Sequence, residues 1–453
     1  MKLFDYLASD DSKILLVNAF QSLTLAQLKQ IQTGYVQLLS DVQGKPVCVD
    51  ITSHFTLALW LLLLDGVVER LTILPPDITD QQRAEFIAQT DSILLLTDRE
   101  AIDANCDVIY LSELQPLLEL NSSNVSLNNN VQTQWVLATS GTTATPKLVV
   151  HTLASLAHQV KRPKGDLQHV WGLLYGLHRF AGLQVFLQTV MAGNTLVLME
   201  KGQALSDVLL LFADNAVSCL SATPTLWRKI LMLPHCDSLD LKAITLGGEI
   251  ADKQILSGLA AQYPMSKIRH IYASTEAGVG FSVSDGLAGF PSYYIEQGIG
   301  QVYLKISQES TLLIKSPACA QRYLNQYDLT LVDGYVDTGD VIRFSQGRWY
   351  FEGRANGTIN VGGNKVQPET VEQVLRAYPG VLLAYVFAKK SSVIGQLVQA
   401  TLVLDDSVTN KKNHVQALRQ YCKLHLKPYQ VPALIKVVDD LPLNENGKVC
   451  RNE

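Results

Sequence analysis

The first 140 residues alternate short apolar runs with stretches of helical periodicity, and this alternation limits the folds open to the chain. Apolar runs at 46–49, 71–74 and 92–96 predict buried strands. Apolar residues at helical spacing predict helices over 23–39, 57–64 and 81–89. Strands that alternate with helices at this spacing are joined by crossovers, so they are expected to be mostly parallel. The fold class is therefore predicted as α/β.

The pattern changes near residue 330. Short segments at 335–337, 341–344 and 348–351 are separated by glycine-containing turns and predict small antiparallel hairpins. Helices over 369–377 and 414–424 and strands over 381–388, 400–404 and 434–438 are predicted to follow. A separate α+β domain of about 100 residues, beginning near Gly353, is a plausible independent unit. Upstream, the Asn- and Ser-rich stretch 121–130 predicts an exposed loop before a strand at 134–138.

Composition excludes several classes of protein. A chain of 453 residues is too long for one compact core, so two or three domains are expected. The net charge of −5 argues against a general nucleic-acid binder. Seven scattered cysteines with no CxxC pair fit reduced thiols. The most apolar stretch, 55–64, is too short to span a bilayer and no secretory signal is visible, so a cytoplasmic protein is predicted.

Residues 139–147 read TSGTTATPK and follow the predicted strand at 134–138. Small residues let backbone N–H groups converge on an anion, hydroxyl groups add donors, and a lysine adds a positive charge. The candidate phosphate ligands are Thr139, Ser140, Gly141, Thr142, Thr143 and Lys147. The spacing is not that of a Walker A loop. A Ser/Thr-rich turn between a strand and a helix explains the composition equally well.

A family resemblance favours the phosphate loop. The segment 137–152, LATSGTTATPKLVVHT, resembles the phosphate-binding loop of the adenylate-forming superfamily, which usually reads T-S-G-[ST]-T-G-x-P-K. That superfamily contains acyl- and aryl-CoA ligases, the adenylation domains of peptide synthetases, and luciferases. Ala144 stands where glycine is usual. Further segments similar to the family's motifs follow in the family's order to the end of the chain, although each alone could be an ordinary turn or tail.

Two of these segments concern the nucleotide and its metal. Residues 271–276, IYASTE, resemble the family's Y-G-x-T-E segment, with Ala273 in place of glycine. The resemblance implies that Tyr272 packs on adenine, that Thr275 contacts phosphate, and that Glu276 is associated with Mg²⁺, a cation that prefers carboxylate oxygen. Residues 245–249, TLGGE, resemble the strand that ends in a glycine pair and imply that Gly248 and Glu249 lie at the nucleotide.

The remaining segments imply a mobile second domain. Asp340 in the DTGD segment 337–340 would bind the ribose hydroxyls, and Arg354 in GRAN, 353–356, would contact ribose or phosphate. The resemblance implies a large domain of several subdomains with mixed sheets over 1–353 and a small domain over 354–453 that rotates about a hinge near Asn356. Rotation would bring Gly362 and Gly363 to the site. Lys448, in the closing P-x-x-x-x-G-K motif, would stabilise charge during adenylate formation.

The resemblance implies an ATP- and Mg²⁺-dependent ligase that activates a small carboxylic acid as an acyl-adenylate and transfers it to a thiol. His178 matches a position that guards the acyl site, although a structural histidine is equally expected. No Asp lies between Trp171 and Gln184, which disfavours an α-amino acid and leaves an aromatic or medium aliphatic acid. No carrier domain follows Lys448, so the acceptor is expected in trans, as coenzyme A or the phosphopantetheine of a separate carrier protein. An oligomer is compatible with the sequence.

Overall fold

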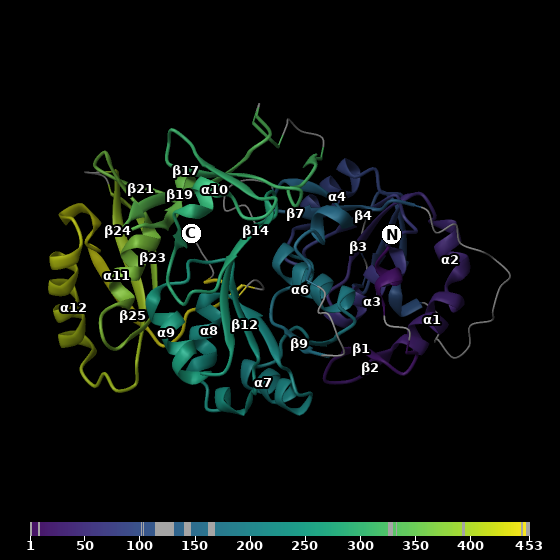
Figure 1. Cartoon of the computed structure of the whole chain (residues 1–453), viewed down its shortest axis with the longest axis horizontal. Helices are drawn as coiled ribbons and strands as arrows, with labels where there is room; N and C mark the ends of the chain where they lie inside the picture. The colour runs from purple at the N-terminus through teal and green to yellow at the C-terminus, as the bar shows by residue number, and fades with distance from the viewer. Residues whose placement is uncertain are drawn as a thin grey trace.

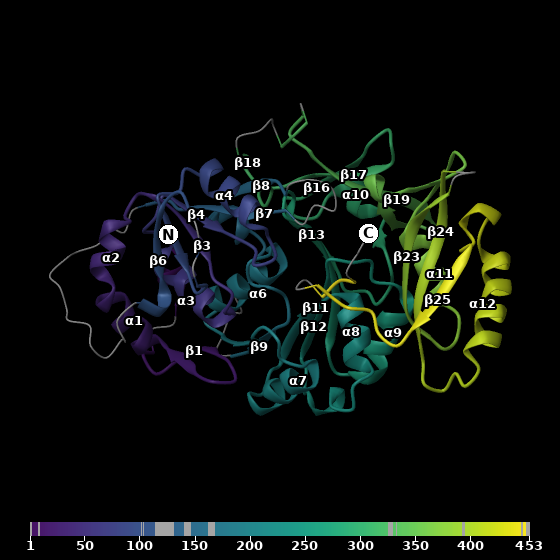
Figure 2. The same cartoon turned by 180° about the vertical axis from the view of Figure 1, so that it is seen from behind.

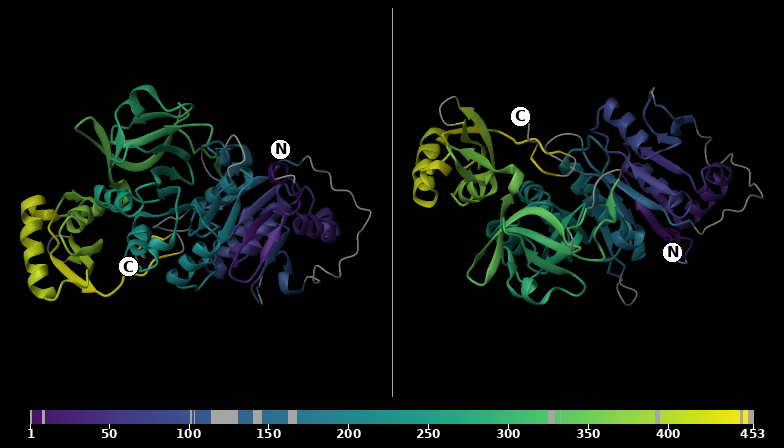
Figure 3. Two further views of the ribbon diagram at one scale, coloured as in Figure 1. Left: turned by 60° about the horizontal axis from the view of Figure 1, so that its bottom comes forward. Right: turned by 90° about the horizontal axis from the view of Figure 1, so that it is seen from above.

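The computed structural model describes residues 2–7, 10–100, 102, 104–113, 131–139, 146–161, 168–324, 329–331, 333–391, 395–444 and 447–449. The predicted loop at 121–130 and residues 140–145 of the phosphate-loop segment lie outside these ranges. The N-terminal region, a central region and the C-terminal region follow one another along the long axis of the molecule (Figures 1 and 3). None of the helices in the described ranges is long and apolar enough to cross a bilayer.

The first sheet has seven strands in the order β18-β8-β7-β4-β3-β5-β6. The strands are β3 (Pro46–Asp50), β4 (Arg70–Ile73), β5 (Leu94–Thr97), β6 (Asp107–Tyr110), β7 (Gln134–Ala138), β8 (Leu148–Thr152) and β18 (Arg322–Tyr323). The strands from β7 to β6 pair in parallel, and β8 pairs antiparallel with β7 on one side and with β18 on the other. The helices α3 (His54–Leu64) and α4 (Asp80–Gln89) are capped by Ser53 and Thr79. Nine of the eleven residues of α3 are buried, because its apolar residues surround the helix.

The predicted helix over 23–39 is wrong in one respect, because it is two helices preceded by a strand. Leu23 lies in β2 (Ser22–Thr24), which pairs with β1 (Ile14–Val17). Thr24 then caps α1 (Leu25–Gly34), and α2 (Val36–Asp41) begins after Tyr35, which is not helical. The weak helix propensity of Gly34 at this point explains the break.

The second sheet has eight strands in the order β14-β13-β12-β11-β9-β10-β1-β2. Its further strands are β9 (Val170–Leu173), β10 (Thr195–Leu198), β11 (Cys219–Ala222), β12 (Ala243–Gly247), β13 (Lys267–Ser274) and β14 (Gly278–Val283). Helix α5 (Leu153–Leu156) follows β8 and contacts β8 and β14, and the helices of the second sheet are α6 (Phe180–Met191), α7 (Leu205–Asp214), α8 (Pro224–Leu231) and α9 (Lys253–Gln262). Pairing is parallel from β1 to β13. The carboxyl ends of these strands therefore share one edge, where ligands bind in open α/β sheets.

A third, antiparallel sheet in the order β15-β20-β19-β17-β16 follows. It comprises β15 (Phe290–Pro291), β16 (Tyr303–Ile306), β17 (Thr311–Lys315), β19 (Val336–Ser345) and β20 (Arg348–Arg354), with α10 (Tyr293–Gln297) beside it. The segments expected at 335–337 and 341–344 belong to one strand, β19, so the three predicted segments form a single hairpin, β19 with β20. Gly339, with a φ of +68°, and an irregularity at Val341 and Ile342 interrupt the strand without ending it.

The C-terminal region forms a small α+β domain with its own hydrophobic core. Its elements are β21 (Ile359–Val361), β22 (Asn364–Val366), α11 (Pro368–Arg376), β23 (Val381–Ser391), β24 (Gly395–Leu404), α12 (Lys411–His425) and β25 (Leu434–Val438). Among the described residues, the short 3₁₀ turns are η1 (Leu3–Tyr6), η2 (Leu111–Glu113), η4 (Cys236–Ser238), η5 (Ala355–Gly357) and η6 (Pro428–Gln430). After β25 the chain crosses from the small domain to α8 of the large part (Figure 2). The predicted α/β class with a smaller α+β C-terminal domain is confirmed.

Candidate active site

Thr139 and Lys147 close the base of the predicted phosphate loop. The Thr139 amide donates to the Lys147 carbonyl at 2.8 Å, and the Lys147 amide donates to Thr139 Oγ1 at 3.1 Å. Ala138 of β7 and Leu148 of β8 are antiparallel partners, so the segment joins two strands and the strand-to-helix turn is excluded. Ser140, Gly141, Thr142 and Thr143 lie outside the described residues.

The side chain of Lys147 points to a residue that the sequence did not single out. Its Nζ lies 4.8 Å from the centroid of the Tyr323 ring. Burial, and then the charge of Glu276, raise the pKa of Tyr323 to about 12. Lys147 is therefore a neighbour of Tyr323, and the Glu276 carbonyl is bonded to the Ala320 amide, three residues before Tyr323.

Tyr272, Asp340 and Arg354 form a chain of hydrogen bonds. The Tyr272 hydroxyl donates to Asp340 Oδ2, and Arg354 Nε donates to Asp340 Oδ1 at 3.1 Å. Burial, and then the Asp340 charge, raise the pKa of Tyr272 well above its ordinary value, so its hydroxyl remains a donor. The structure thus brings together three of the predicted nucleotide residues at the junction of the second and third sheets.

The ring of Tyr272 is itself packed within the protein. Its centroid lies 4.7 Å from that of Phe351, with the planes only 4° apart, and 5.4 Å from that of Phe281. Its predicted contact with adenine remains a prediction, because these stacking contacts already occupy part of the ring.

Thr275 and Glu276 lie in the turn between β13 and β14. The Thr275 carbonyl accepts a hydrogen bond from Nε2 of buried His151 at 2.7 Å. The Glu276 carbonyl accepts one from the Ala320 amide at 2.9 Å. His151 was not among the predicted site residues, because the 124 residues that separate it from Thr275 leave no local signal.

The donor set around Glu276 is compatible with Mg²⁺. Within the described ranges, no group of three or more His, Cys, Asp or Glu side chains could hold a metal ion by itself. Mg²⁺ usually binds one or two carboxylates and takes its other oxygens from substrate phosphates and water. A single glutamate beside a phosphate loop therefore fits this ion.

Lys448 lies against the end of β12. A Cβ built on Gly248 would be 3.2 Å from Lys448 Cε and 3.7 Å from Lys448 Nζ. Thr223 Oγ1, at the start of α8, donates to the Gly447 carbonyl at 2.5 Å and holds the terminal segment there. In Figure 2 this segment runs from β25 to the ends of β11 and β12. Lys448 and Gly248, 200 residues apart in sequence, are therefore neighbours.

Glu249, the second predicted nucleotide residue at the end of β12, binds to the start of α8. Glu249 Oε2 accepts a hydrogen bond from the Thr225 amide at 2.9 Å, in the first turn of α8. A carboxylate is favourable at a helix N-terminus, so this contact accounts for the residue without a nucleotide. The neighbouring strand residue Gly247 accepts a long hydrogen bond of 3.5 Å from the buried Tyr175 hydroxyl.

The other candidates lie apart from these contacts. Gly362 and Gly363 form the turn between β21 and β22, both at positive φ, and a Cβ on either would meet no atom within 4 Å. His178 is buried before α6, with its ring 6.0 Å from that of His54. Arg179, considered for a second substrate carboxylate, pairs with Asp77 at 2.6 Å and precedes α6 as its N-cap.

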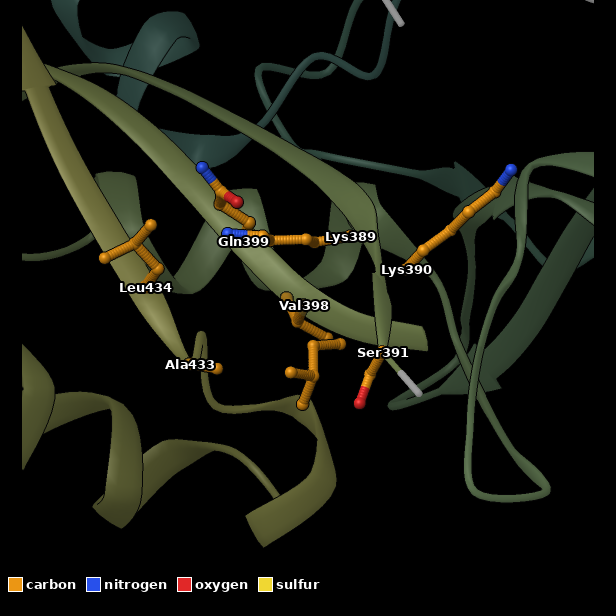
Figure 4. A pocket seen from close by; sticks show the side chains of 8 residues that line it. Lys389, Lys390, Ser391, Val398, Gln399, Ala433 and Leu434 are labelled. Carbon is orange, nitrogen blue, oxygen red and sulfur yellow. The ribbon is translucent and has the colours of Figure 1, made fainter. Parts of the chain in front are cut away.

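The small domain carries a separate shallow depression of about 290 Å³ at the end of the β23–β24 hairpin (Figure 4). Its lining residues are Lys389, Lys390, Ser391, Leu397, Val398, Gln399, Ala433 and Leu434. None of them is a predicted site residue, so this depression is distinct from the nucleotide candidates.

Known proteins resemble this chain over most of its length. A 2-succinylbenzoate–CoA ligase of Bacillus subtilis (strain 168) is 26% identical over 408 residues, which are 85% of this chain and 82% of that protein. The 4-hydroxybutyrate–CoA ligase 1 of Metallosphaera sedula is 28% identical over 70% of this chain and 60% of its own length. A plipastatin synthase of B. subtilis is 23% identical over 83% of this chain, but only 16% of that protein is covered.

Solved structures share the fold. An o-succinylbenzoate CoA synthetase from B. subtilis, in complex with its acyl-adenylate intermediate, superposes with a TM-score of 0.76 at 22% identity and covers 100% of this chain and 97% of that one. A benzoate CoA ligase from Burkholderia xenovorans LB400 superposes with a TM-score of 0.82 at 19% identity and covers 99% and 98%.

Family profiles match both parts of the chain. The AMP-binding enzyme profile matches residues 71–324, and the profile of the AMP-binding enzyme C-terminal domain matches residues 370–448. The first profile alone covers more than half of the sequence, and the second falls on the small α+β domain. The protein belongs to the AMP-binding enzyme family, within the adenylate-forming superfamily.

Proposed function

We propose that this protein uses ATP to convert a carboxylic acid into an acyl-adenylate and then transfers the acyl group to the thiol of coenzyme A. The observation that carries the proposal is the position of Lys448 against Gly248, in the same protein that holds Lys147 beside Tyr323 and bonds the Glu276 carbonyl to Ala320. We infer that these cations and the carboxylate, which come from three distant segments, face one triphosphate. The relatives named as CoA ligases support the same activity.

In the first half-reaction a carboxylate oxygen of the acid attacks the α-phosphorus of ATP, and pyrophosphate leaves. The protein's contribution is alignment and neutralisation of charge, without a covalent nucleophile. Lys147 and Lys448 provide positive charge, and Asp340 provides acceptors for the ribose hydroxyls. Glu276 would hold Mg²⁺, which adds positive charge beside the phosphates when it is bound. In the second half-reaction a thiol attacks the carbonyl carbon and AMP leaves.

The two half-reactions are proposed to use different orientations of the small domain. Lys448 lies at the site, while the β21–β22 turn is open around Gly362 and Gly363, where an added Cβ would meet no atom within 4 Å. This orientation suits adenylate formation. Asn356 lies in η5, between the large part and the small domain. Rotation about residues near Asn356 would move Lys448 away from the site and bring the β21–β22 glycine turn to it.

The proposed acid is aromatic or medium aliphatic. Arg179 is engaged by Asp77, which leaves it poorly placed to bind a second substrate carboxylate. We therefore do not assign 2-succinylbenzoate, although several relatives carry that name. The alternative acceptor is the phosphopantetheine of a separate carrier protein, and similarity to the plipastatin synthase favours testing it.

Acid-dependent exchange of pyrophosphate into ATP tests the proposal, with a panel of aromatic and aliphatic acids. Lys448→Ala is expected to reduce exchange about a hundredfold or more, because it removes a charge that stabilises the transition state. Thioester formation from supplied acyl-adenylate should be largely unaffected. Lys436→Ala, which removes an exposed lysine of β25, is the matched control.

Two outcomes would contradict the proposal. If no acid of the panel supports exchange, the ligase activity is excluded. If Lys448→Ala slows both half-reactions equally, the rotation is excluded. Supplying coenzyme A and a phosphopantetheinylated carrier protein in parallel then identifies the acceptor.

A further inference from the structure

Thr223 lies where β11 ends and α8 begins, at the edge formed by the carboxyl ends of the parallel strands. It is the N-cap residue of α8, and its Oγ1 accepts a hydrogen bond from the Leu226 amide at 3.0 Å. The residue is fully buried, with 0% of its surface exposed. The contact satisfies one of the backbone N–H groups that a helix leaves without a partner in its first turn.

The same hydroxyl group makes a second contact, with the terminal segment. A hydroxyl group carries one proton and two lone pairs, and the Leu226 amide uses a lone pair. The proton is left for the Gly447 carbonyl, to which Oγ1 donates at 2.5 Å. Thr223 therefore joins the second sheet to the residue immediately before Lys448.

The backbone around Lys448 carries this contact to the lysine. The Asn444 amide donates to the Lys448 carbonyl at 2.8 Å, and the Lys448 amide donates to Asn444 Oδ1 at 3.2 Å. Gly447 has a φ of +67°, and a Cβ added to it would lie 3.1 Å from Leu226 Cδ2 and 3.3 Å from Thr223 Oγ1. Gly447 is therefore packed closely against the first turn of α8.

Lys229, near the other end of α8, fixes an earlier part of the same segment. Its Nζ donates to Asp440 Oδ1 at 2.7 Å and to the Leu441 carbonyl at 2.8 Å. These contacts direct the path of the segment, whereas the Thr223 contact is one residue from Lys448. Because a lysine side chain is long and flexible, the place where its backbone is held limits the positions that its ammonium group can take.

We propose that Thr223 is a positioning residue for adenylate formation, whose hydroxyl proton holds the Gly447 carbonyl and thereby places Lys448 at the end of β12. The inference rests on the proposed role of Lys448. Rotation of the small domain would separate Gly447 from Thr223. The hydroxyl group should therefore matter in the first half-reaction and not in the second.

Single-turnover adenylate formation tests this role, with an acid that supports pyrophosphate exchange in the wild-type protein. Thr223→Val keeps the shape of the side chain but removes the hydroxyl group, and it should slow adenylate formation about tenfold. Thioester formation from supplied adenylate should be unchanged. Thr223→Ser keeps the hydroxyl group and should retain most of the wild-type rate.

Thr79→Val is the matched control. It removes the N-cap hydroxyl group of α4, which accepts from the Gln82 amide at 3.2 Å, and should alter neither half-reaction. Gly447→Ala disturbs the same contact from the side of the terminal segment and leaves the Thr223 side chain in place. It should also slow adenylate formation and spare thioester formation.

A double-mutant cycle separates positioning from general packing. In a Lys448→Ala background, Thr223→Val should cause no further loss of adenylate formation, because the two residues act through one interaction. Equal slowing of both half-reactions by Thr223→Val, equal effects of Thr223→Val and Thr79→Val, or a tenfold loss that persists without Lys448 would each overturn the inference. If no acid supports exchange in the wild-type protein, the proposed function fails instead.

Discussion

Among single residues, His151 shows how a group remote in sequence supports the site. Its Nε2 donates to the Thr275 carbonyl at 2.7 Å, and its Nδ1 lies 3.0 Å from Ser155 Oγ. Burial lowers its pKa to about 4, from an ordinary value of 6.5. The imidazole is therefore neutral near pH 7. Because a carbonyl can only accept a hydrogen bond, Nε2 carries the proton.

This pKa predicts a pH-dependent contribution to stability. Between pH 6.5 and 4 the unfolded chain protonates His151 and the folded chain does not, so the contribution is complete above pH 6.5 and is lost as pH falls through 4. The difference is at most about 3 kcal/mol, at 1.36 kcal/mol per pKa unit. We expect the gap in unfolding free energy between wild type and His151→Gln, measured in urea, to narrow over this window.

The pH dependence of wild-type stability alone does not isolate His151, because the titration of Asp65 changes stability with pH in the opposite direction. The comparison with His151→Gln is therefore needed. Burial raises the pKa of Asp65 to about 6, so its contribution is complete below pH 3.8 and is lost as pH rises through 6. Asp65 is present in both proteins, and its effect cancels in the difference. A gap that does not change with pH would refute the assignment to His151.

At the scale of elements, the β13–β14 turn depends on Gly278. Its φ is +66°, and a Cβ at this position would lie 2.1 Å from the Ala318 carbonyl oxygen. Any side chain would therefore separate the turn from the segment 318–320, which bonds the Glu276 carbonyl. Thr275 and Glu276 would lose their support.

Gly278→Ala is expected to lower the unfolding free energy by about 1–3 kcal/mol from backbone strain, and further through the clash. Gly286→Ala is a matched control, since Gly286 has a φ of +77° and open space around it. Urea unfolding of both variants isolates the clash. If Gly278→Ala and Gly286→Ala lower the unfolding free energy equally, the backbone at Ala318 moves away from the added Cβ without cost. In that case Gly278→Ala should also retain its affinity for Mg·ATP.

Elements also differ in how far the sequence predicts them. The apolar runs of β3, β4 and β7 and the periodicity of α3, α4 and α12 predict those elements to within a few residues, because burial imposes the pattern. β18 has only two residues, Arg322 and Tyr323, and no periodicity. Its place beside β8 results from long-range pairing, which local pattern does not encode. Tyr323 was therefore not among the predicted residues, whereas motifs pointed to Asp340, Glu276 and Lys448, whose roles remain predictions.

In the whole molecule, a charged cluster joins the small domain to the large part. Arg376 of α11 lies 3.3 Å from Asp252, which also accepts from Arg228 at 2.6 Å and caps α9. The side chains of Arg228, Asp252 and Arg376 are each less than 15% exposed. Lys229 adds a contact of 2.7 Å to Asp440. These contacts exist in the orientation that places Lys448 at Gly248, and rotation of the small domain would break them.

The cluster should therefore favour adenylate formation over thioester formation. Arg376→Met keeps the aliphatic packing and leaves the Arg228–Asp252 pair intact, and it removes the Asp252 contact across the interface together with the Glu372 contact within α11. We expect single-turnover adenylate formation to slow about tenfold, equivalent to roughly 1.4 kcal/mol of lost stabilisation. Thioester formation from supplied adenylate should be unchanged or faster, because the rotated orientation gains population relative to the first.

Lys411→Met is the control for this prediction, because it removes an exposed ion pair, with Asp439, that lies wholly within the small domain. It should alter neither half-reaction. If Arg376→Met slows both half-reactions equally, the cluster stabilises the small domain itself and not one of its orientations. If Arg376→Met slows only thioester formation, the Arg376–Asp252 contact stabilises the rotated orientation. Opposite responses of the two half-reactions would make Arg376 and Asp252 determinants of the balance between the two orientations of the small domain.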